Sequence, residues 1–540
     1  MITPASDCPD PVDVIVVGAG INGLAVGREL AHGGMSVAVF DRSDIASETS
    51  AISTRLIHGG LKYLERGEIK LVRECAREQK ILFHTAPHLI EQYPMLIPFL
   101  PGNKRPAWML TAGLLIQELL TPTKPVKRSE LVGPKKMAAK WPSLYEAGIK
   151  RGAVYYDSQV PVTERMCVEL AADCVAHGAR IHTYTEVTEV TSHPNGVTGV
   201  VWTDLHTGRS GTLNAPIIVN AAGPWVDSVL ARTGIDHPRL IGPTRGSHFI
   251  VAPFEGAPST CIFFESPIDT RPMFVLPWEG MYMLGSTDIP VQDANTPIVA
   301  DTDEVNYIVN SVNALLPQAN LSADDILWSY SGVRPLPYAE GVDDPATITR
   351  DYRLDSHDGP LTGLFTIVGG KWTTHRALGE DVARTLRAQA GLPPIPSPTR
   401  RALLPGAERQ ASVPPHPRPS WLGNHSAARL SRLYGATAEA IIAQAQKDDT
   451  LRLVLDNDSG ALSAEVWWAI HREGAKTLTD IVLRRMATFI NSRAGIDSAN
   501  TIADLLVTWG MWSAERAEQE RANFIEWVKR YTPKELERAW

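Results

Sequence analysis

The stretch Val14-Ile-Val-Val-Gly-Ala-Gly-Ile-Asn-Gly23 joins a run of β-branched residues to three closely spaced glycines. Such runs form strands that are buried on both faces of a parallel sheet. Apolar and small residues then follow at helical spacing until Gly33-Gly34, where the helix is expected to stop. A second apolar run, Val37-Ala-Val-Phe, ends on Asp41. The sequence therefore predicts a strand–helix–strand unit with its glycines in the first turn.

The spacing of these glycines has a physical reason. In such a turn Gly18 permits the tight bend, Gly20 lets a pyrophosphate approach the backbone, and Gly23 lets the helix pack closely on the strand. The unpaired N–H groups at the start of the helix face the phosphates. Asp41 is placed to accept hydrogen bonds from a ribose hydroxyl. We interpret the unit as a dinucleotide-binding site, and the alternative is a purely structural turn.

The residues after Asp41 favour FAD over NAD. The regular alternation of strands and helices that is typical of NAD enzymes breaks off there, and a hydroxyl-rich loop, 47–60, follows and ends in a glycine pair. Such a loop donates hydrogen bonds to a pyrophosphate and lets the backbone approach a flat ring. Two more junctions from a strand to a glycine turn, at Gly223 and Gly370, lie far away in the sequence. One flavin contacted by three segments explains all of these features.

The pattern changes several times along the 540 residues, which are too many for one core. Ser158–Ala179 has helical spacing, residues 241–335 alternate as antiparallel strands do, and helical periodicity dominates after residue 421. Proline-rich stretches between them indicate a linker. We expect an FAD-binding domain from residues 12–75, 150–240 and 336–392, a substrate-binding cap from 76–149 and 241–335, a linker at 393–420 and a helical domain at 421–540.

Composition and charge exclude several classes of protein. The chain is 44% apolar with a formal net charge of −8, which argues against a disordered protein and against a dedicated nucleic-acid binder. The five cysteines form no CxxC pair, which suits a reducing compartment and predicts no metal site. Residues 1–11 lack the features of a secretory signal, and no apolar stretch is long enough to span a membrane. We expect a cytoplasmic protein.

Six longer motifs occur in order along the chain. They are Thr54-Arg-Leu-Ile-His-Gly-Gly-Leu-Lys-Tyr-Leu-Glu65, Ala221-Ala-Gly-Pro-Trp225, Gly246-Ser-His248, Gly285-Ser-Thr-Asp288, Tyr330-Ser-Gly-Val-Arg-Pro335 and Gly369-Gly-Lys-Trp-Thr-Thr374. Together they resemble the FAD-dependent glycerol-3-phosphate dehydrogenases and oxidases from about residue 12 to 390, and more loosely into the tail. The resemblance implies an α/β fold plus an α domain: a Rossmann-like FAD-binding domain of the D-amino-acid-oxidase or glutathione-reductase type, an antiparallel-sheet substrate domain and a C-terminal helical domain.

The resemblance also implies a reaction. Members of the family oxidise the C2 alcohol of sn-glycerol 3-phosphate to dihydroxyacetone phosphate by hydride transfer to flavin N5, and quinone or O₂ then takes the electrons. One alternative is the same chemistry on a related polyol phosphate or phosphonate. Another is a flavin-binding protein without turnover, although such a protein would not require the charged residues described next.

The resemblance assigns residues to the two halves of the expected site. No attachment residue typical of the family stands out, so we expect FAD to bind non-covalently. The expected cofactor-binding residues are Gly18, Gly20, Gly23, Asp41, Thr49, Ser50, Ser53, His58, Gly59, Gly60, Ala222, Gly223, Gly370, Lys371, Trp372 and Thr373. The expected substrate-pocket residues are Lys62, Tyr63, His248, Arg334, Arg350 and Lys371.

The residue types in the substrate pocket suit a phosphorylated alcohol. Arginine forks match phosphate geometry, and a lysine contributes a point charge. Removal of the hydroxyl proton needs a base, which we assign to His248, with Arg334 or a water sharing that role. Each residue also has an ordinary structural explanation: a satisfied buried histidine at 248, an Arg350 paired with Asp351 or another carboxylate, and a solvated Lys371 at a helix start.

Three positions depart from the family pattern. Lys62 stands where arginine is common, Arg55 where lysine is common, and His375 where tyrosine is common. A lysine cannot reproduce a bidentate arginine contact, so these changes affect the expected grip on phosphate and hence the identity of the substrate more than the reaction.

A basic region surrounds the apolar stretch Trp108–Leu120. Eight Lys and Arg residues lie between Lys104 and Lys140 against Glu118 and Glu130. This pattern favours peripheral contact with the inner face of the cell membrane, and the alternative is a buried helix beside a solvated basic loop. The helical tail has no catalytic constellation, and we expect the protein to be a homodimer.

Overall fold

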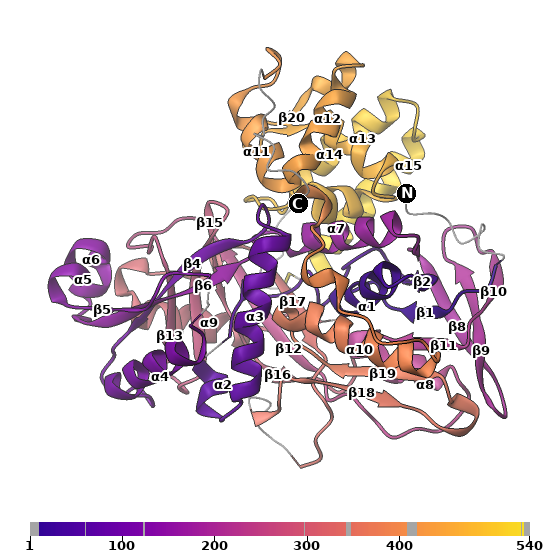
Figure 1. The fold of residues 1–540 in the computed structure, drawn as a ribbon. Coiled ribbons are helices and arrows are strands. Elements are labelled where there is room, and N and C mark those ends of the chain that lie inside the picture. The colour runs from indigo at the N-terminus through magenta and orange to yellow at the C-terminus, as the bar shows by residue number, and fades with distance from the viewer. Residues whose placement is uncertain are drawn as a thin grey trace.

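The computed structural model describes residues 10–59, 61–122, 125–295, 298–341, 347–407, 418–530 and 532–533. These ranges form two large sheets with their helices, a small three-stranded sheet and a set of C-terminal helices. The two large sheets lie side by side, and the C-terminal helices, orange to yellow, lie above both in the view of Figure 1.

The first large sheet contains the predicted strand–helix–strand unit. Its six strands run in the order β18-β19-β11-β1-β2-β7, all parallel except β18 at the edge. They are β1 (Val14–Val17), β2 (Val37–Phe40), β7 (Arg180–His182), β11 (Ile217–Asn220), β18 (Tyr352–Ser356) and β19 (Leu364–Gly369). Every residue of β1, β2, β11 and β19 is buried, as near-continuous apolar runs in a parallel sheet require. The expected strands before Gly223 and Gly370 are thus both present.

Helices and a small sheet cover the two faces of this sheet. Helices α1 (Ile21–His32), α7 (Thr163–Ala176) and α10 (His375–Gln389) share one apolar core with it. A second core contains residues of α8 (Val226–Ala231) and of the sheet formed by β8 (Thr185–His193), β9 (Gly196–Asp204) and β10 (Ser210–Asn214). The helix predicted to begin at Ser158 begins at Thr163 instead. Ser158 belongs to strand β6 (Gly152–Gln159).

The second large sheet has the order β16-β12-β15-β14-β13-β4-β6-β3, with β17 on β12 and β5 on β6. Its strands are β3 (Leu56–Ile57), β4 (Glu91–Pro98), β5 (Glu130–Val132), β6 (Gly152–Gln159), β12 (Thr244–Val251), β13 (Cys261–Glu265), β14 (Pro272–Trp278), β15 (Met281–Gly285), β16 (Ile289–Pro290) and β17 (Ile326–Arg334). The expected antiparallel strands within 241–335 are all in this sheet. Residues 152–159, which we had placed in the FAD-binding domain, pair with β4 and lie here as well.

Six helices accompany the second sheet: α2 (Leu61–Glu65), α3 (Ile69–Thr85), α4 (Ala107–Leu120), α5 (Pro134–Lys140), α6 (Pro142–Glu146) and α9 (Thr302–Leu315). The apolar side chains of α9 pack on one face of the sheet. Helix α4 differs from the others because Leu110 and Leu114 are buried while Trp108 and Leu119 are 72% and 80% exposed. Among the described residues, no helix is both long and apolar enough to cross a bilayer.

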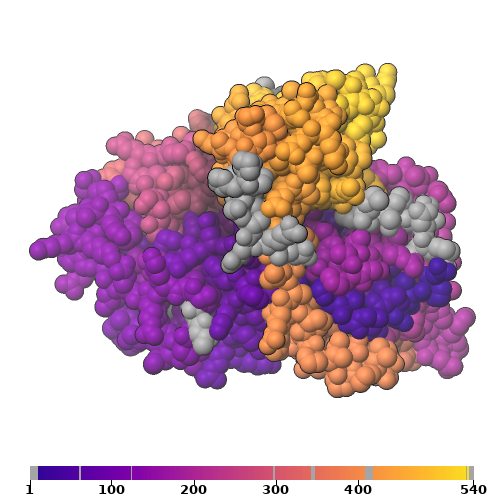
Figure 2. Space-filling model, turned by 45° about the horizontal axis from the view of Figure 1, so that its top comes forward, coloured from indigo at the N-terminus to yellow at the C-terminus, as the bar shows by residue number. Residues whose placement is uncertain are grey.

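The C-terminal domain is helical, as predicted. It consists of α11 (Asn424–Tyr434), α12 (Ala438–Ala445), α13 (Ser463–His471), α14 (Ile496–Thr508) and α15 (Ala514–Arg530), with a short pair of strands, β20 (Val454–Asp456) and β21 (Ala461–Leu462). After α10 the chain crosses the surface of the first domain before it reaches these helices (Figure 2). Residues 408–417 of the predicted linker lie outside the described ranges.

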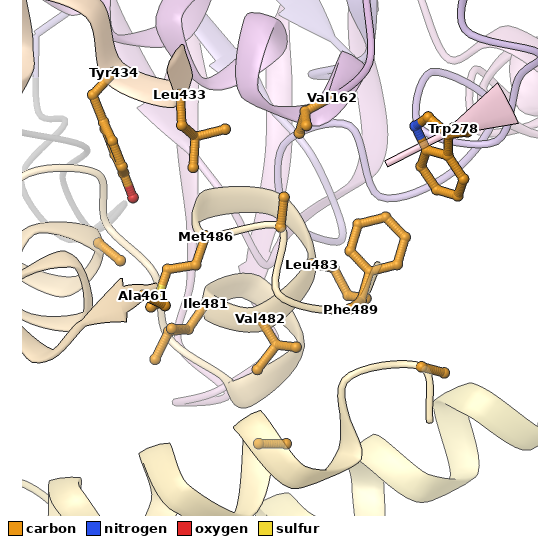
Figure 3. Packing of buried hydrophobic residues seen from close by; sticks show 14 of the residues in the cluster. Val162, Trp278, Leu433, Tyr434, Ala461, Ile481, Val482, Leu483, Met486 and Phe489 are labelled. Carbon is orange, nitrogen blue, oxygen red and sulfur yellow. The ribbon is translucent and has the colours of Figure 1, made fainter. Parts of the chain in front are cut away.

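The C-terminal domain shares a core with the second sheet. One apolar cluster joins Leu433, Phe489 and other residues of the helical domain to Trp278 and Trp328 of the sheet, and Figure 3 shows Phe489 close to Trp278. Buried ion pairs join the same domain to the loop after β2. Asp44 accepts hydrogen bonds from Arg484 and Arg485, and none of the three is more than 4% exposed. The helical domain is thus fixed against both sheets.

Candidate active site

A cavity of about 490 Å³ lies at the carboxyl ends of the strands of the first sheet. Its lining includes the residues that end or follow four of those strands: Val17, Asp41, Ala221 and Gly370. Ligands bind at this edge of open α/β sheets. The opposite wall comes from the second sheet, through residues of β12, β14 and β17.

The first glycine turn is as crowded as the spacing predicted. Gly18 has φ +115°, and a Cβ there would lie 2.6 Å from the carbonyl oxygen of Ala221. A Cβ at Gly23 would lie only 1.9 Å from the carbonyl oxygen of Gly18, so the helix can approach the strand only because this position has no side chain. Gly18 and Gly20 line the cavity, whereas Gly23 acts through this close packing.

Asp41 is held in place by backbone groups. Its Oδ2 accepts from the N–H of Ala19 at 2.7 Å, and its Oδ1 accepts from the N–H of Ser43 at 2.8 Å. Burial raises the pKa of Asp41 to about 6, although these two backbone hydrogen bonds oppose the shift. The carboxylate is therefore ionised at neutral pH and faces the cavity as a hydrogen-bond acceptor.

The hydroxyl-rich loop is fastened to its surroundings by its own side chains. Ser50 Oγ accepts from the N–H of Ile21 at 2.9 Å, at the first residue of α1. Thr49 Oγ1 donates to the carbonyl of Val333 at 2.7 Å, and so joins the loop to β17. The hydroxyl of Ser53 accepts from the next-but-one backbone N–H at 3.1 Å. The loop thus lines the cavity in one fixed conformation.

Unpartnered polar atoms in the lining show that the cavity suits a large polar ligand. Among the described residues, Asn22 Oδ1, Trp225 Nε1 and His248 Nδ1 are buried without a hydrogen-bond partner, and all three residues line the cavity. Buried polar atoms without partners are costly in a protein that has no ligand for them. These atoms, the glycine turn and Asp41 together fit a dinucleotide such as FAD.

A carboxylate bridges two arginines at the substrate side of the cavity. Arg334 Nη1 lies 3.0 Å from Asp288 Oδ1, and Arg350 Nη2 lies 2.9 Å from Asp288 Oδ2. Arg334 also donates to Ser286 Oγ at 3.1 Å. Burial lowers the pKa of Arg334, and the charge of Asp288 opposes that shift. Arg350 therefore pairs with another carboxylate, as one sequence alternative foresaw, but the carboxylate lies inside the pocket.

Lys371 also lies in the lining of the cavity. It donates to the carbonyl of His58, and its Nζ lies 4.3 Å from the centre of the Tyr63 ring and 3.7 Å from Cys75 Sγ. It is half-buried rather than solvated at a helix start. Its ammonium contributes a second positive region near Tyr63, which is itself 6% exposed and lines the cavity.

His248 is a buried and neutral imidazole. Its Nε2 lies 3.0 Å from the hydroxyl of Thr54, and its ring stacks on that of Tyr330 with centres 5.0 Å apart. Burial, together with the charges of Arg334 and Arg55, lowers its pKa to about 3. The imidazole is therefore unprotonated throughout the physiological pH range.

Two of the three departures from the family pattern are held by partners within the protein. Arg55 lines the cavity, but it is 2% exposed and its two terminal nitrogens form a bidentate ion pair with Glu164, with distances of 2.6 and 2.7 Å. His375 is buried, and its Nδ1 lies 2.8 Å from the carbonyl of Trp372. The side chain of Lys62 lies outside the described part of the structure, as does Gly60.

Most of the predicted site residues meet in this one cavity. Gly23 and Gly59 are not in its lining, and a Cβ at Gly59 would instead lie 3.5 Å from Cβ of Cys75. The predicted residues that line the cavity are Gly18, Gly20, Asp41, Thr49, Ser50, Ser53, His58, Tyr63, Ala222, Gly223, His248, Arg334, Arg350, Gly370, Lys371, Trp372 and Thr373.

Two residues of the site had no assigned role in the sequence analysis. Thr54 contacts His248, and Asp288 joins Arg334 to Arg350. Both lie inside quoted motifs, at the first position of Thr54–Glu65 and at the last position of Gly285–Asp288. The available signal for Asp288 was an acidic residue within one of the six motifs.

One group outside the cavity has the residue types of a metal site. His32, Asp173 and His177 place one potential ligand atom each within 4.8 Å of one another. The Asp173 carboxylate, however, already accepts from Arg28 Nε at 2.5 Å, and that guanidinium opposes a cation at the same oxygen.

The comparisons with known proteins agree with this geometry. Residues 13–385 match the family described as FAD dependent oxidoreductase, and residues 397–517 match the C-terminal domain of alpha-glycerophosphate oxidase. The chain is 34% identical to a glycerol-3-phosphate dehydrogenase of Synechocystis over 96% of both chains, and 32% identical to a D-erythritol 1-phosphate dehydrogenase of Brucella abortus over 96% of this chain and 98% of that one.

A solved structure shows the same fold over nearly the whole length. The glycerol-3-phosphate dehydrogenase of Bacillus halodurans, complexed with FAD, superposes with a TM-score of 0.77 at 22% identity and covers 99% of this chain and 97% of that one. The chain is therefore an FAD-dependent oxidoreductase, and it belongs to the family of the glycerol-3-phosphate dehydrogenases.

Proposed function

We propose that this enzyme oxidises the C2 hydroxyl of sn-glycerol 3-phosphate and forms dihydroxyacetone phosphate, with FAD, bound non-covalently, as hydride acceptor. The observation that carries the proposal is the pair Arg334–Arg350, bridged by Asp288, in the same cavity as the neutral imidazole of His248. Two guanidinium groups suit a phosphate dianion, and an unprotonated imidazole suits a hydroxyl that must lose its proton.

The chain's own residues then have distinct tasks. Arg334, Arg350 and Lys371 bind the phosphate, while His248 takes the hydroxyl proton at a ring nitrogen and Thr54 holds the imidazole in place. A dianion beside Arg334 offsets the positive charge that lowers the pKa of His248, so substrate binding strengthens the base. The residues with unpartnered atoms and the glycine turn would hold FAD, which supplies hydride acceptance when bound.

Flavin bleaching tests substrate and reaction together. Under anaerobic conditions sn-glycerol 3-phosphate should remove the oxidised flavin absorbance of the purified holoenzyme, and dihydroxyacetone phosphate should appear in equal amount. Readmission of air then separates O₂ from quinone as the electron acceptor. A flavin that stays oxidised would refute glycerol 3-phosphate as substrate.

A related polyol phosphate is the second candidate substrate. The D-erythritol 1-phosphate dehydrogenase of Brucella abortus covers as much of this chain as the glycerol-3-phosphate dehydrogenase of Synechocystis does, and at nearly equal identity. Lys62 is the sequence feature that separates this chain from the common pattern. Faster bleaching by a tetritol phosphate, together with a gain on glycerol 3-phosphate in Lys62→Arg, would favour this second candidate.

Helix α4 supports the proposed peripheral contact with anionic lipid. Its exposed apolar stripe contains Trp108, Leu115 and Leu119, and the nearby basic residues Lys127 and Arg128 are exposed. The double variant Trp108→Glu and Leu119→Glu should abolish co-sedimentation with anionic vesicles at low salt. Leu205→Glu, at an exposed leucine in the turn between β9 and β10, serves as the matched control. Equal sedimentation of all three proteins would refute the contact.

A further inference from the structure

A loop of the C-terminal domain reaches the wall behind His248. Asn491 accepts a hydrogen bond through its carbonyl from Trp328 Nε1 at 2.8 Å. The ring of Phe489, 4% exposed, lies 5.8 Å from that of Trp328 and 6.1 Å from that of Trp278. Figure 3 shows the Phe489 ring beneath Trp278, at the border of the two domains. The helical domain therefore contacts the sheet that forms one wall of the cavity.

Arg55, in the hydroxyl-rich loop 47–60, contacts this loop of the C-terminal domain. Its guanidinium lies 4.7 Å from the centre of the Trp278 ring and 5.8 Å from that of Phe489, while both of its terminal nitrogens pair with Glu164. The Arg55 backbone has φ +59°, a left-handed conformation that a residue with a side chain keeps only when its surroundings enforce it. Phe489, Trp278 and Glu164 contact the Arg55 side chain. The side chain also donates to the carbonyls of Ala51 and Pro161, and the Arg55 carbonyl accepts from the N–H of Val160.

The residues that fix His248 lie next to these two contacts in the chain. Thr54, whose hydroxyl is 3.0 Å from His248 Nε2, directly precedes Arg55. Tyr330, which stacks on His248, is two residues from Trp328 on β17, and its hydroxyl donates to the carbonyl of Ser53 at 2.9 Å. A shift of Arg55 would therefore move Thr54, and a shift of Trp328 would move Tyr330. Thr54 and Tyr330 are the two partners of the imidazole.

We propose that Phe489 and Arg55 are positioning residues for His248, so that the C-terminal domain sets the orientation of the proton acceptor. This inference rests on the role of His248 in the proposed function. Without the Phe489 ring, Arg55 and Trp328 each lose one of the surfaces that confine them, and the space that the ring leaves lets both side chains shift. A misplacement of about 1 Å at a catalytic group costs up to about a hundredfold in rate.

The test compares two phenylalanines of the same domain. Phe489→Ala and Phe524→Ala each remove a buried ring, but Phe524, 1% exposed on α15, stacks only on Trp527 among the aromatic rings described. Both variants should retain FAD and lose melting temperature to a similar extent. In Phe489→Ala the rate of flavin reduction at saturating glycerol 3-phosphate should fall at least about tenfold, with KM changed by less than about twofold. In Phe524→Ala the rate should stay within about twofold of the wild type.

Two milder variants keep the proposal falsifiable if Phe489→Ala does not fold. Phe489→Leu should give an intermediate rate, and Arg55→Lys, which keeps the charge but not the bidentate pair, should slow reduction without loss of FAD. Equal rates in both phenylalanine variants, or wild-type rates in Phe489→Leu and Arg55→Lys, would overturn the inference. A wild-type flavin that no polyol phosphate reduces would instead refute the proposed function, and that result is read before any variant is made.

Discussion

Gly23→Ala should abolish tight binding of FAD, whereas Gly27→Ala, one turn later on the same helix, should leave it intact. A Cβ at Gly23 would lie 1.9 Å from the carbonyl oxygen of Gly18, so helix and turn must separate by more than about 1 Å before the contact is tolerable. A Cβ at Gly27 would meet Val39 Cγ2 at 3.2 Å and Cys174 Sγ at 3.8 Å, which are side-chain atoms that need to shift by only a few tenths of an ångström.

The two substitutions differ in their net effect on the free energy of folding and FAD binding. Alanine gains about 1 kcal/mol over glycine in a helix interior, which roughly offsets the small cost of the contact at position 27. At position 23 the same gain is outweighed by overpacking of about 1–3 kcal/mol and by displacement of the N–H groups that would bind phosphate. We expect the dissociation constant of FAD to rise at least about tenfold in Gly23→Ala.

Fluorescence titration of the FAD-free proteins measures this directly, because free FAD loses fluorescence when it binds. Melting temperatures with and without FAD separate loss of binding from loss of folding. A Gly23→Ala protein that binds FAD as tightly as the wild type would refute the close-packing explanation. Equal weakening in Gly27→Ala would show that the helix tolerates no alanine at all, and that the clash at Gly18 is not the cause.

Three further predictions concern charges in the cavity. Arg350→Ala should lower kcat/KM for glycerol 3-phosphate about tenfold to a hundredfold with unchanged FAD content, because a charged hydrogen bond to phosphate contributes about 1.5–3 kcal/mol. Steady-state kinetics in which KM does not rise would contradict this. Because the pKa of His248 in the free enzyme is lowered to about 3, kcat/KM should not fall between pH 8 and pH 5 through this group. An acid limb of kcat/KM near 6.5 that vanishes in His248→Gln would be evidence against a neutral imidazole. Burial raises the pKa of Asp41 to about 6, so its carboxylate is an ionised acceptor above that pH and is protonated below it. The affinity for FAD should therefore fall from pH 8 to pH 5 in the wild type but stay level in Asp41→Asn. Parallel pH curves of the two proteins would refute the assignment of Asp41 as a ligand of FAD.

Local signals in the sequence were sufficient for the four central strands of the first sheet. The runs that became β1 and β2 are apolar throughout, and those that became β11 and β19 contain one polar residue each, Asn220 and Thr366. All four runs lead into a glycine turn or Asp41, which is why their burial and their common edge could be predicted. Helix α13 lies in the region after residue 421, where the helical periodicity predicted a helical domain. Most of the residues that the motifs assigned to the site also lie in the lining of one cavity.

Choices between distant partners were not accessible in the same way. Residues 152–159 are as apolar as a strand of either sheet, and only their pairing with β4 decides between them. Arg55 is a cation within one of the six motifs, yet its guanidinium pairs with Glu164, which lies more than a hundred residues later in the chain. The bridge from Asp288 to Arg350 also depends on a meeting of distant segments that no local spacing encodes.

The ion pairs of Asp44 with Arg484 and Arg485 have a consequence for how the chain can be shortened. Removal of one partner from a buried pair costs about 3–5 kcal/mol, and a truncation before residue 421 would remove both arginines and uncover the rings of Trp278 and Trp328. The first 400 residues are therefore not an independent module, even though they hold the entire cavity lining. Limited proteolysis within the linker should leave two fragments that stay together and unfold as one unit.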